Sequence, residues 1–127
     1  MNNPTFGFED LDVWKKANAF KIAITKLSEQ FPPEEKYRLK DQLIRSARSI
    51  AALIAEGHGR FTYPDQIHFC IQARGSLSES INHLIGAFDD HYISAETLKG
   101  NKLQGKELER LLNGYLQFLR TKRDTQK

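Results

Sequence analysis

The sequence predicts an all-α protein, an antiparallel up-and-down four-helix bundle formed by a single domain, residues 1–127. Apolar residues recur at steps of three and four in four segments, prolines and glycines separate these segments, and no alternating β-branched run indicates a strand. With 39% hydrophobic and 28% charged residues, 127 residues suffice for one core. We expect helices at about 9–31, 34–58, 63–91 and 94–121, with residues 1–8 as an N-terminal arm and 122–127 as a basic tail.

The first expected helix follows an arm that contains Pro4, Gly7 and two phenylalanines. Acidic residues at 9, 10 and 12 favour a helix N-terminus, and Pro32 and Pro33 end the helix because proline lacks the amide donor. Its apolar stripe is Val13, Ala17, Phe20, Ile24, Leu27 and Phe31.

The second expected helix begins near Pro33 or Glu34, since proline and acidic residues suit a first turn. Gly57 and Gly59 mark its end, where we expect a left-handed cap. A second apolar flank lies about 100° from the main stripe, so this helix should contact neighbours on two sides and be central. The main stripe is Leu39, Leu43, Ala47, Ile50, Ile54 and Gly57, and the flank is Ile44, Ala51 and Ala55.

The third and fourth expected helices begin near Pro64, a first-turn position, and near Ser94, an N-cap. Gly100 and Gly105 each cost about 1 kcal/mol relative to alanine, so the first half of the fourth helix should fray or break. Short links make consecutive helices antiparallel. The stripes are Cys70, Ala73, Leu77, Ile81, Leu84 and Phe88 in the third helix, and Leu98, Leu108, Leu112, Tyr115 and Leu119 in the fourth.

Composition indicates a cytoplasmic protein. The longest uncharged apolar stretch, Ser49 to Ala55, is far shorter than the roughly 20 residues that cross a bilayer, and the first residues lack the pattern of a signal peptide. The single cysteine, Cys70, is on an apolar stripe and agrees with a reducing compartment.

Charge is unevenly distributed along the chain, although the net value is only +3. Residues 61–98 carry one basic residue against five acids, whereas residues 99–127 carry eight basic residues against three acids. Two basic groups could contact phosphate: Arg38, Arg45 and Arg48, which fall within an arc of about 80° opposite the main stripe of the second helix, and Arg120, Lys122 and Arg123 near the C-terminus. The alternative is a solvated surface that only maintains solubility.

A face of the third helix combines two glycines with polar side chains, Gly75, Glu79, Asn82 and Gly86. Glycine in the middle of a helix weakens it and is often retained because another backbone packs closely there. We therefore expect a subunit interface on this face, with a local bend as the alternative.

No combination of residues predicts catalysis, a metal site or a cofactor. Glu56, His58 and Arg60 surround Gly57 and Gly59, but no nucleophile with an orienting partner accompanies them. The four histidines are scattered, and the pair Glu79 and His83 offers two ligands where zinc needs three or four. Trp14 is expected to contact the bundle or the arm.

Three segments, FEDLDVWKKA (Phe8 to Ala17), SIAALIAEGHGR (Ser49 to Arg60) and ARGSLSES (Ala73 to Ser80), together resemble a bacterial family. This is the four-helix-bundle family of proteins encoded in intervening sequences of 23S rRNA genes, the so-called S23 ribosomal protein family. The chain also resembles a related protein, the accessory protein of diversity-generating retroelements. Leu53 departs from the asparagine that many relatives have before ile-ala-glu-gly.

The resemblance implies a protomer that assembles into a ring, usually a pentamer, with no known catalytic activity and, in the retroelement relative, a role with nucleic acid. We therefore expect a non-enzymatic homo-oligomer that acts as a scaffold or accessory protein on rRNA or other structured RNA or DNA. The alternative is a protein–protein interaction module with no nucleic-acid role. A small-molecule or metal site inside the bundle ranks last, because the stripes carry no polar cluster.

Overall fold

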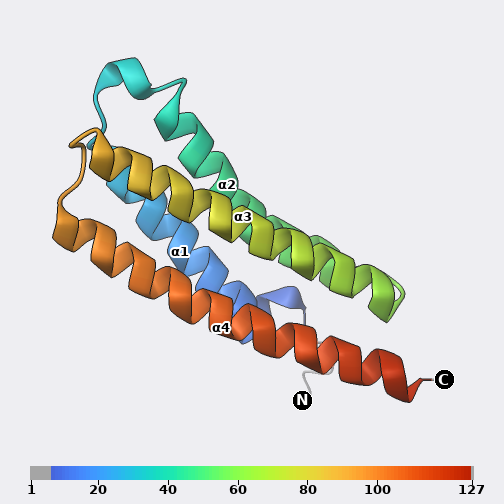
Figure 1. Ribbon diagram of the computed structural model, residues 1–127. Helices are drawn as coiled ribbons and strands as arrows, with labels where there is room; N and C mark the ends of the chain where they lie inside the picture. The colour runs from blue at the N-terminus through green and yellow to red at the C-terminus, as the bar shows by residue number, and fades with distance from the viewer. Residues whose placement is uncertain (1–6, 127) are drawn as a thin grey trace, which may run out of the picture.

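The computed structural model describes residues 7–126, which form four α-helices and no strand (Figure 1). The helices are α1 (Asp12–Ser28), α2 (Leu39–His58), α3 (Tyr63–Asp89) and α4 (Ala95–Thr125). Consecutive helices run in opposite directions, which confirms the predicted bundle. Of the expected N-terminal arm, residues 1–6 lie outside the described part of the chain, as does residue 127 of the tail.

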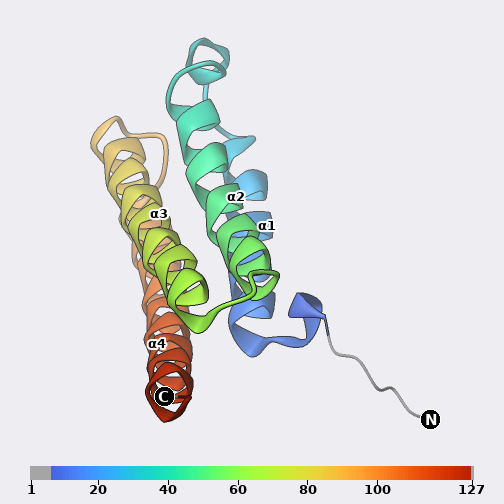
Figure 2. The same ribbon diagram turned by 90° about the vertical axis from the view of Figure 1, so that its right-hand side faces the viewer.

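The four helices pack in a closed cycle, α1 against α2, α2 against α3, α3 against α4, and α4 against α1. Figure 2 shows α1 and α2 as one pair beside the pair α3 and α4. The contact between α2 and α3 is the most extensive. α2 thus has the two neighbours that its apolar flanks predict, but each of the other helices also has two, so α2 is not a central helix.

The core lies where the four predicted stripes meet. Its largest fully buried side chains include Phe20 and Ile24 from α1 and Leu84 from α3. Phe88 was expected in this core but is 36% exposed, and Ala87 is buried in its place. The other fully buried aliphatic side chains from the predicted stripes are Leu43, Ile50, Ile54, Leu108, Leu112 and Leu119.

Several helix ends differ from the prediction. α1 ends at Ser28 rather than at 31, and α2 begins at Leu39 rather than at 34, because Pro33–Glu35 form a separate 3-10 turn. A second 3-10 turn, Phe8–Asp10, precedes α1 and places Phe8 against Trp14, with ring centroids 5.3 Å apart. Trp14 therefore makes the expected contact with the segment before α1.

α4 is longer and more regular than expected. It runs without a break through Gly100 and Gly105 and continues to Thr125, so most of the expected tail is helical. Ser94 caps it as predicted, its Oγ accepting a hydrogen bond from the Thr97 amide at 3.1 Å. Packing against α3 keeps the first half of α4 helical despite its glycines.

The left-handed residue lies at a different helix end from the one predicted. Gly59 after α2 has φ −80°, in the right-handed region, and no glycine in residues 7–126 has a positive φ. His91 after α3 has φ 66° instead. The Tyr92 amide donates to the Ala87 carbonyl and the His91 amide to the Phe88 carbonyl, both at 2.9 Å, which is the Schellman arrangement of a helix C-terminus.

One polar contact joins the two loops at this end of the bundle. The Tyr92 hydroxyl donates a hydrogen bond of 2.7 Å to Glu35 Oε2, and its ring lies 5.6 Å from the ring of Phe31. The hydrogen bond lowers the pKa of Glu35 and raises the pKa of Tyr92 to about 12. The link between α1 and α2 is thereby tied to the link between α3 and α4.

Candidate functional site

The three arginines predicted on the second helix lie on its exposed side. Arg38 immediately precedes α2, and Arg45 and Arg48 follow on its first three turns. Arg45 Nε is 3.3 Å from Asp41 Oδ2, but the arginine side chain remains 78% exposed. Within residues 7–126, no carboxylate lies within 4.0 Å of Arg38 or Arg48. This face of α2 therefore presents positive charge that the described chain only partly neutralises.

Two side chains of the basic group near the C-terminus contact other side chains of α4. Arg123 Nε is 2.9 Å from Asp124 Oδ1, and Lys122 Nζ lies 5.7 Å from the ring centroid of Phe118. Arg120 is half-buried. All three lie on the last turns of α4 rather than on a flexible arm.

The structure does not bring the two predicted basic groups together. α2 begins at one end of the bundle, whereas α4 ends at the other, as the teal and red ends of the ribbon show (Figure 1). α2 and α4 also lie diagonally across the bundle, with no Cα atom of one within 8 Å of a Cα atom of the other. A single nucleic-acid backbone that contacted both groups would have to run along the length of the bundle and around it.

A third basic group was missed from the sequence. Lys99, Lys102 and Lys106 are exposed on the first half of α4, at steps of three and four. The signal was the excess of basic residues after position 98, and the continuity of α4 through Gly100 and Gly105, where fraying was expected, aligns these lysines. Because α4 is a continuous helix, these lysines occupy one side of a rigid element.

The predicted interface on α3 is an open surface in the single chain. A Cβ built on Gly75 or Gly86 would meet nothing within 4 Å, and Asn82 is exposed. Glu79 Oε2 is 3.3 Å from His83 Nε2 on the same helix. The apolar side chains of Ile71 and Ile85, 45% and 37% exposed, lie on the same side of the helix. This α3 face is thus low in relief and partly apolar.

A buried serine network between α2 and α3 was not anticipated. The Ser46 and Ser80 hydroxyls are 2.8 Å apart, and the Ser76 hydroxyl donates to Ser49 Oγ at 3.0 Å. Since each hydroxyl has one proton, one of Ser46 and Ser80 donates to the other, and the second donates to its backbone carbonyl at 3.0 Å, the Leu43 carbonyl for Ser46 or the Ser76 carbonyl for Ser80. The available signal was the pair of serines four residues apart in ARGSLSES, one of the segments that carry the family resemblance. The small hydroxyls let α2 and α3 approach closely.

The charged side chains at the end of α2 and in the loop after it contact each other. Arg60 Nη2 is 3.0 Å from Glu56 Oε2, and its guanidinium lies 4.6 Å from the ring centroid of Phe69. Gly57 is buried, and a Cβ there would be only 2.8 Å from Phe69 Cβ. This glycine therefore permits close helix packing rather than a left-handed cap, and the acid and the cation neutralise each other.

Cys70 is the core residue that its stripe predicts. It is 2% exposed, and its thiol lies 3.8 Å from the Leu112 carbonyl oxygen. Burial raises its pKa to about 11. Among residues 7–126, no three or more histidine, cysteine, aspartate or glutamate side chains are grouped as a metal site, and no helix there has the length and apolarity to span a bilayer.

Fold and surface together define a small four-helix-bundle protein with separate basic faces and an open α3 face. The family model of the 23S rRNA-intervening sequence protein matches residues 9–114, and the chain belongs to this family. It is a family of small helical proteins without any known catalytic activity. The resemblance carried by the three sequence segments is thereby confirmed.

A solved structure shows the same fold. The crystal structure of a protein with unknown function from the S23 ribosomal protein family, from Bacteroides thetaiotaomicron VPI-5482, matches with a TM-score of 0.76 and 24% sequence identity. The match covers 83% of this chain and 95% of that chain. No match is found among the curated proteins.

Proposed function

We propose that this chain is a non-enzymatic, homo-oligomeric scaffold, a pentamer by family resemblance, that associates with rRNA or another structured nucleic acid through phosphate contacts. The family takes its name from intervening sequences of 23S rRNA, which makes RNA the first nucleic acid to test. The observation that carries the proposal is the exposed arginine face of α2, formed by Arg38, Arg45 and Arg48.

This arginine face suits phosphate rather than base recognition. Guanidinium groups donate two hydrogen bonds side by side, which matches phosphate oxygens. The three side chains extend over about ten residues, or about 15 Å at 1.5 Å per residue, so they can follow several phosphates. Binding should therefore depend on salt and tolerate changes of sequence. Arg120, Lys122 and Arg123 form a second, separate contact in this proposal.

A salt titration of nucleic-acid affinity tests the arginine face. The triple variant R38A/R45A/R48A should weaken binding to structured RNA and duplex DNA, and reduce the slope of log K against log salt by about 3 if each arginine neutralises one phosphate. The triple variant K99A/K102A/K106A removes the same charge from α4, diagonally across the bundle, and should retain the wild-type slope. No binding at low salt, or loss of binding only in the α4 variant, would contradict the arginine face.

Self-association through the α3 face completes the proposal. A helix face with two glycines allows another helix to approach closely, and exposed Ile71 and Ile85 supply apolar area on either side. Asn82 and Glu79 provide polar groups that can fix the register of the contact. A second copy of the chain would therefore cover a surface that is otherwise open.

Light scattering with glycine variants tests this assembly. Gly75→Arg and Gly86→Arg should shift the mass toward the 14.6 kDa of one chain, because each places a long charged side chain in the interface. Gly114→Arg is the matched control, since this glycine of α4 also has nothing within 4 Å of a built Cβ, and it should leave the mass unchanged. A wild-type protein that remains a monomer at all working concentrations would overturn the assembly.

A protein-only interaction module is the second candidate, favoured by two exposed aromatic side chains. Phe61, in the link between α2 and α3, is 99% exposed, and Tyr37, before α2, is 83% exposed. Aromatic residues are enriched among the side chains that contribute most to protein interfaces. Absence of nucleic-acid binding at low salt, together with loss of a protein partner in Phe61→Ser, would favour this candidate.

A further inference from the structure

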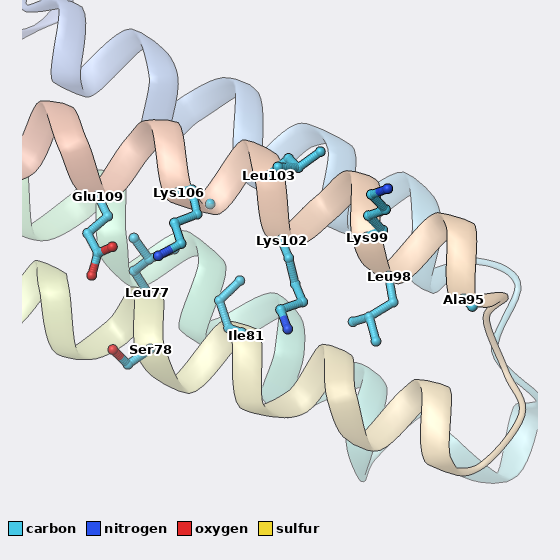
Figure 3. A pocket seen from close by; sticks show the side chains of 11 residues that line it. Leu77, Ser78, Ile81, Ala95, Leu98, Lys99, Lys102, Leu103, Lys106 and Glu109 are labelled. Carbon is cyan, nitrogen blue, oxygen red and sulfur yellow. The ribbon is translucent and has the colours of Figure 1, made fainter.

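A groove of about 550 Å³ lies between α3 and the first half of α4 (Figure 3). Leu77 and Ile81 of α3 and Leu98 of α4 form its apolar floor. α4 contributes the small residues Ala95 and Gly105 to the lining, and a Cβ on Gly105 would lie 2.9 Å from Ile81 Cδ1, so α3 and α4 approach closely beneath the groove. One continuous side of α4 lines the groove, because its lining residues include positions 95, 98, 102, 105 and 109, which recur at steps of three and four.

The groove is bordered by lysines that lack acidic partners. In Figure 3, Lys102 and Lys106 extend from α4 toward α3, over the apolar floor, while the side chain of Lys99, at the rim of the groove, points away from α3. No carboxylate of residues 7–126 lies within 4.0 Å of any of these three ammonium groups. Glu109 is the single acid of the lining, so the groove has a net positive charge above an apolar base.

We propose that this groove binds an acidic amphipathic helix of a partner protein. The lining from Ala95 to Glu109 spans fourteen steps of α4, about 21 Å or four helical turns, a length that suits a helix with apolar anchors at i, i+3 or i+4, and i+7. Lys102 and Lys106 are one turn apart, so they match carboxylates one turn apart on the partner. Their aliphatic stems can cover the anchors while the ammonium groups remain solvated.

The combination of charge and apolar area selects this ligand over others. A phosphate backbone would use the lysines but leave the floor of Leu77, Ile81 and Leu98 uncovered. A fatty-acid anion would use the floor but has one carboxylate for two lysines. An acidic amphipathic helix satisfies both sets of groups. This inference is independent of the arginine face, because α2 lies diagonally across the bundle from α4.

Fluorescence anisotropy with a designed peptide tests the charge of the groove. The probe is a labelled 18-residue helical peptide with leucines at i, i+3, i+4 and i+7 and flanking glutamates. It should bind saturably in 50 mM NaCl, and K102E/K106E should weaken binding about tenfold, since two attractions become repulsions. The control K15E/K26E has the same charge change at exposed positions of α1 outside the groove and should bind like wild type. Equal binding by K102E/K106E, or by a peptide with lysines in place of glutamates, would overturn the proposal.

A steric variant tests the floor. Ala95→Trp places an indole in the groove from an exposed position and should abolish peptide binding, while Ala19→Trp, at an exposed position on α1, should not. Circular dichroism would verify that both variants fold. Unchanged binding by Ala95→Trp would overturn the proposal. Saturable binding of sodium dodecanoate without binding of the peptide would also overturn it. If the wild-type protein did not bind the peptide and Ala95→Trp converted an oligomer into a monomer, the groove would be the contact site of a second copy, which would likewise overturn the proposal.

Discussion

Alanine substitutions at four helical glycines provide a quantitative test of how closely the helices pack. Alanine in place of glycine in a helix interior stabilises by about 1 kcal/mol when the new methyl group meets no obstacle. At Gly100 and Gly114 a built Cβ has no neighbour within 4 Å. We expect each of these variants to gain about 1 kcal/mol, or about 3 to 5 °C in Tm for a domain of this size.

The two buried glycines should behave differently from these and from each other. At Gly57 the built Cβ is 2.8 Å from Phe69 Cβ, an atom fixed by the α3 backbone, so α2 and α3 must separate at a cost of about 1–3 kcal/mol. The net effect of Gly57→Ala is a loss of roughly 0–2 kcal/mol. At Gly105 the built Cβ is 2.9 Å from Ile81 Cδ1, the end of a side chain that can rotate, so gain and cost should nearly cancel.

Urea unfolding followed by circular dichroism at one fixed protein concentration would measure these differences, since self-association adds a concentration-dependent term. The expected order of stability is Gly114→Ala and Gly100→Ala above wild type, Gly105→Ala near it and Gly57→Ala below. If Gly57→Ala were as stabilising as Gly114→Ala, the close approach of α2 and α3 at Gly57 would be wrong. A uniform gain at all four positions would refute the reasoning from contact distances altogether.

Three further predictions concern polar groups that are buried or half-buried. Ser46→Ala and Ser80→Ala should each cost only about 1 kcal/mol, because the remaining hydroxyl still has a backbone acceptor. The two substitutions should show coupling in a double-mutant cycle, because the two hydroxyls are 2.8 Å apart; no coupling would contradict this contact. Burial raises the pKa of Tyr115 to about 12 from 10, so its contribution to stability is complete below pH 10 and is lost as pH rises through 12; Tyr115→Phe should reduce the loss of unfolding free energy over this interval, measured by urea titration at each pH. Cys70, with a pKa raised to about 11, should not react with a thiol reagent at pH 8 until urea unfolds the chain.

The fold could be predicted because helical periodicity is a local signal. Buried Phe20, Ile50 and Leu112 occupy the predicted stripes, and Ser94 caps α4 as its position before an acidic first turn indicates. The errors concern positions where several local solutions compete. Two consecutive prolines permit either a helix start or a short 3-10 turn, and the left-handed cap falls on His91, which is not a glycine.

The candidate sites were less accessible to sequence reasoning. The helical arc of Arg38, Arg45 and Arg48 predicts their exposure, and all three are exposed. Their separation from the C-terminal basic group depends on which helices are neighbours, a property that no single helix encodes. The groove beside Lys102 and Lys106 likewise requires α3 and α4 to meet at Gly105 before it exists.

The ion pairs of this chain separate stability from recognition. Every ion pair that the structure records within residues 7–126 joins residues at most four positions apart, so none of them connects two helices. Exposed pairs of this kind contribute roughly 0.3–0.5 kcal/mol each, whereas the helices are held by the apolar core and by the serines between α2 and α3. Acidic residues of α3 and basic residues of α4 therefore do not satisfy each other across the helix contact. Their charges remain available to molecules outside the bundle, and salt should affect what the protein binds far more than whether it folds.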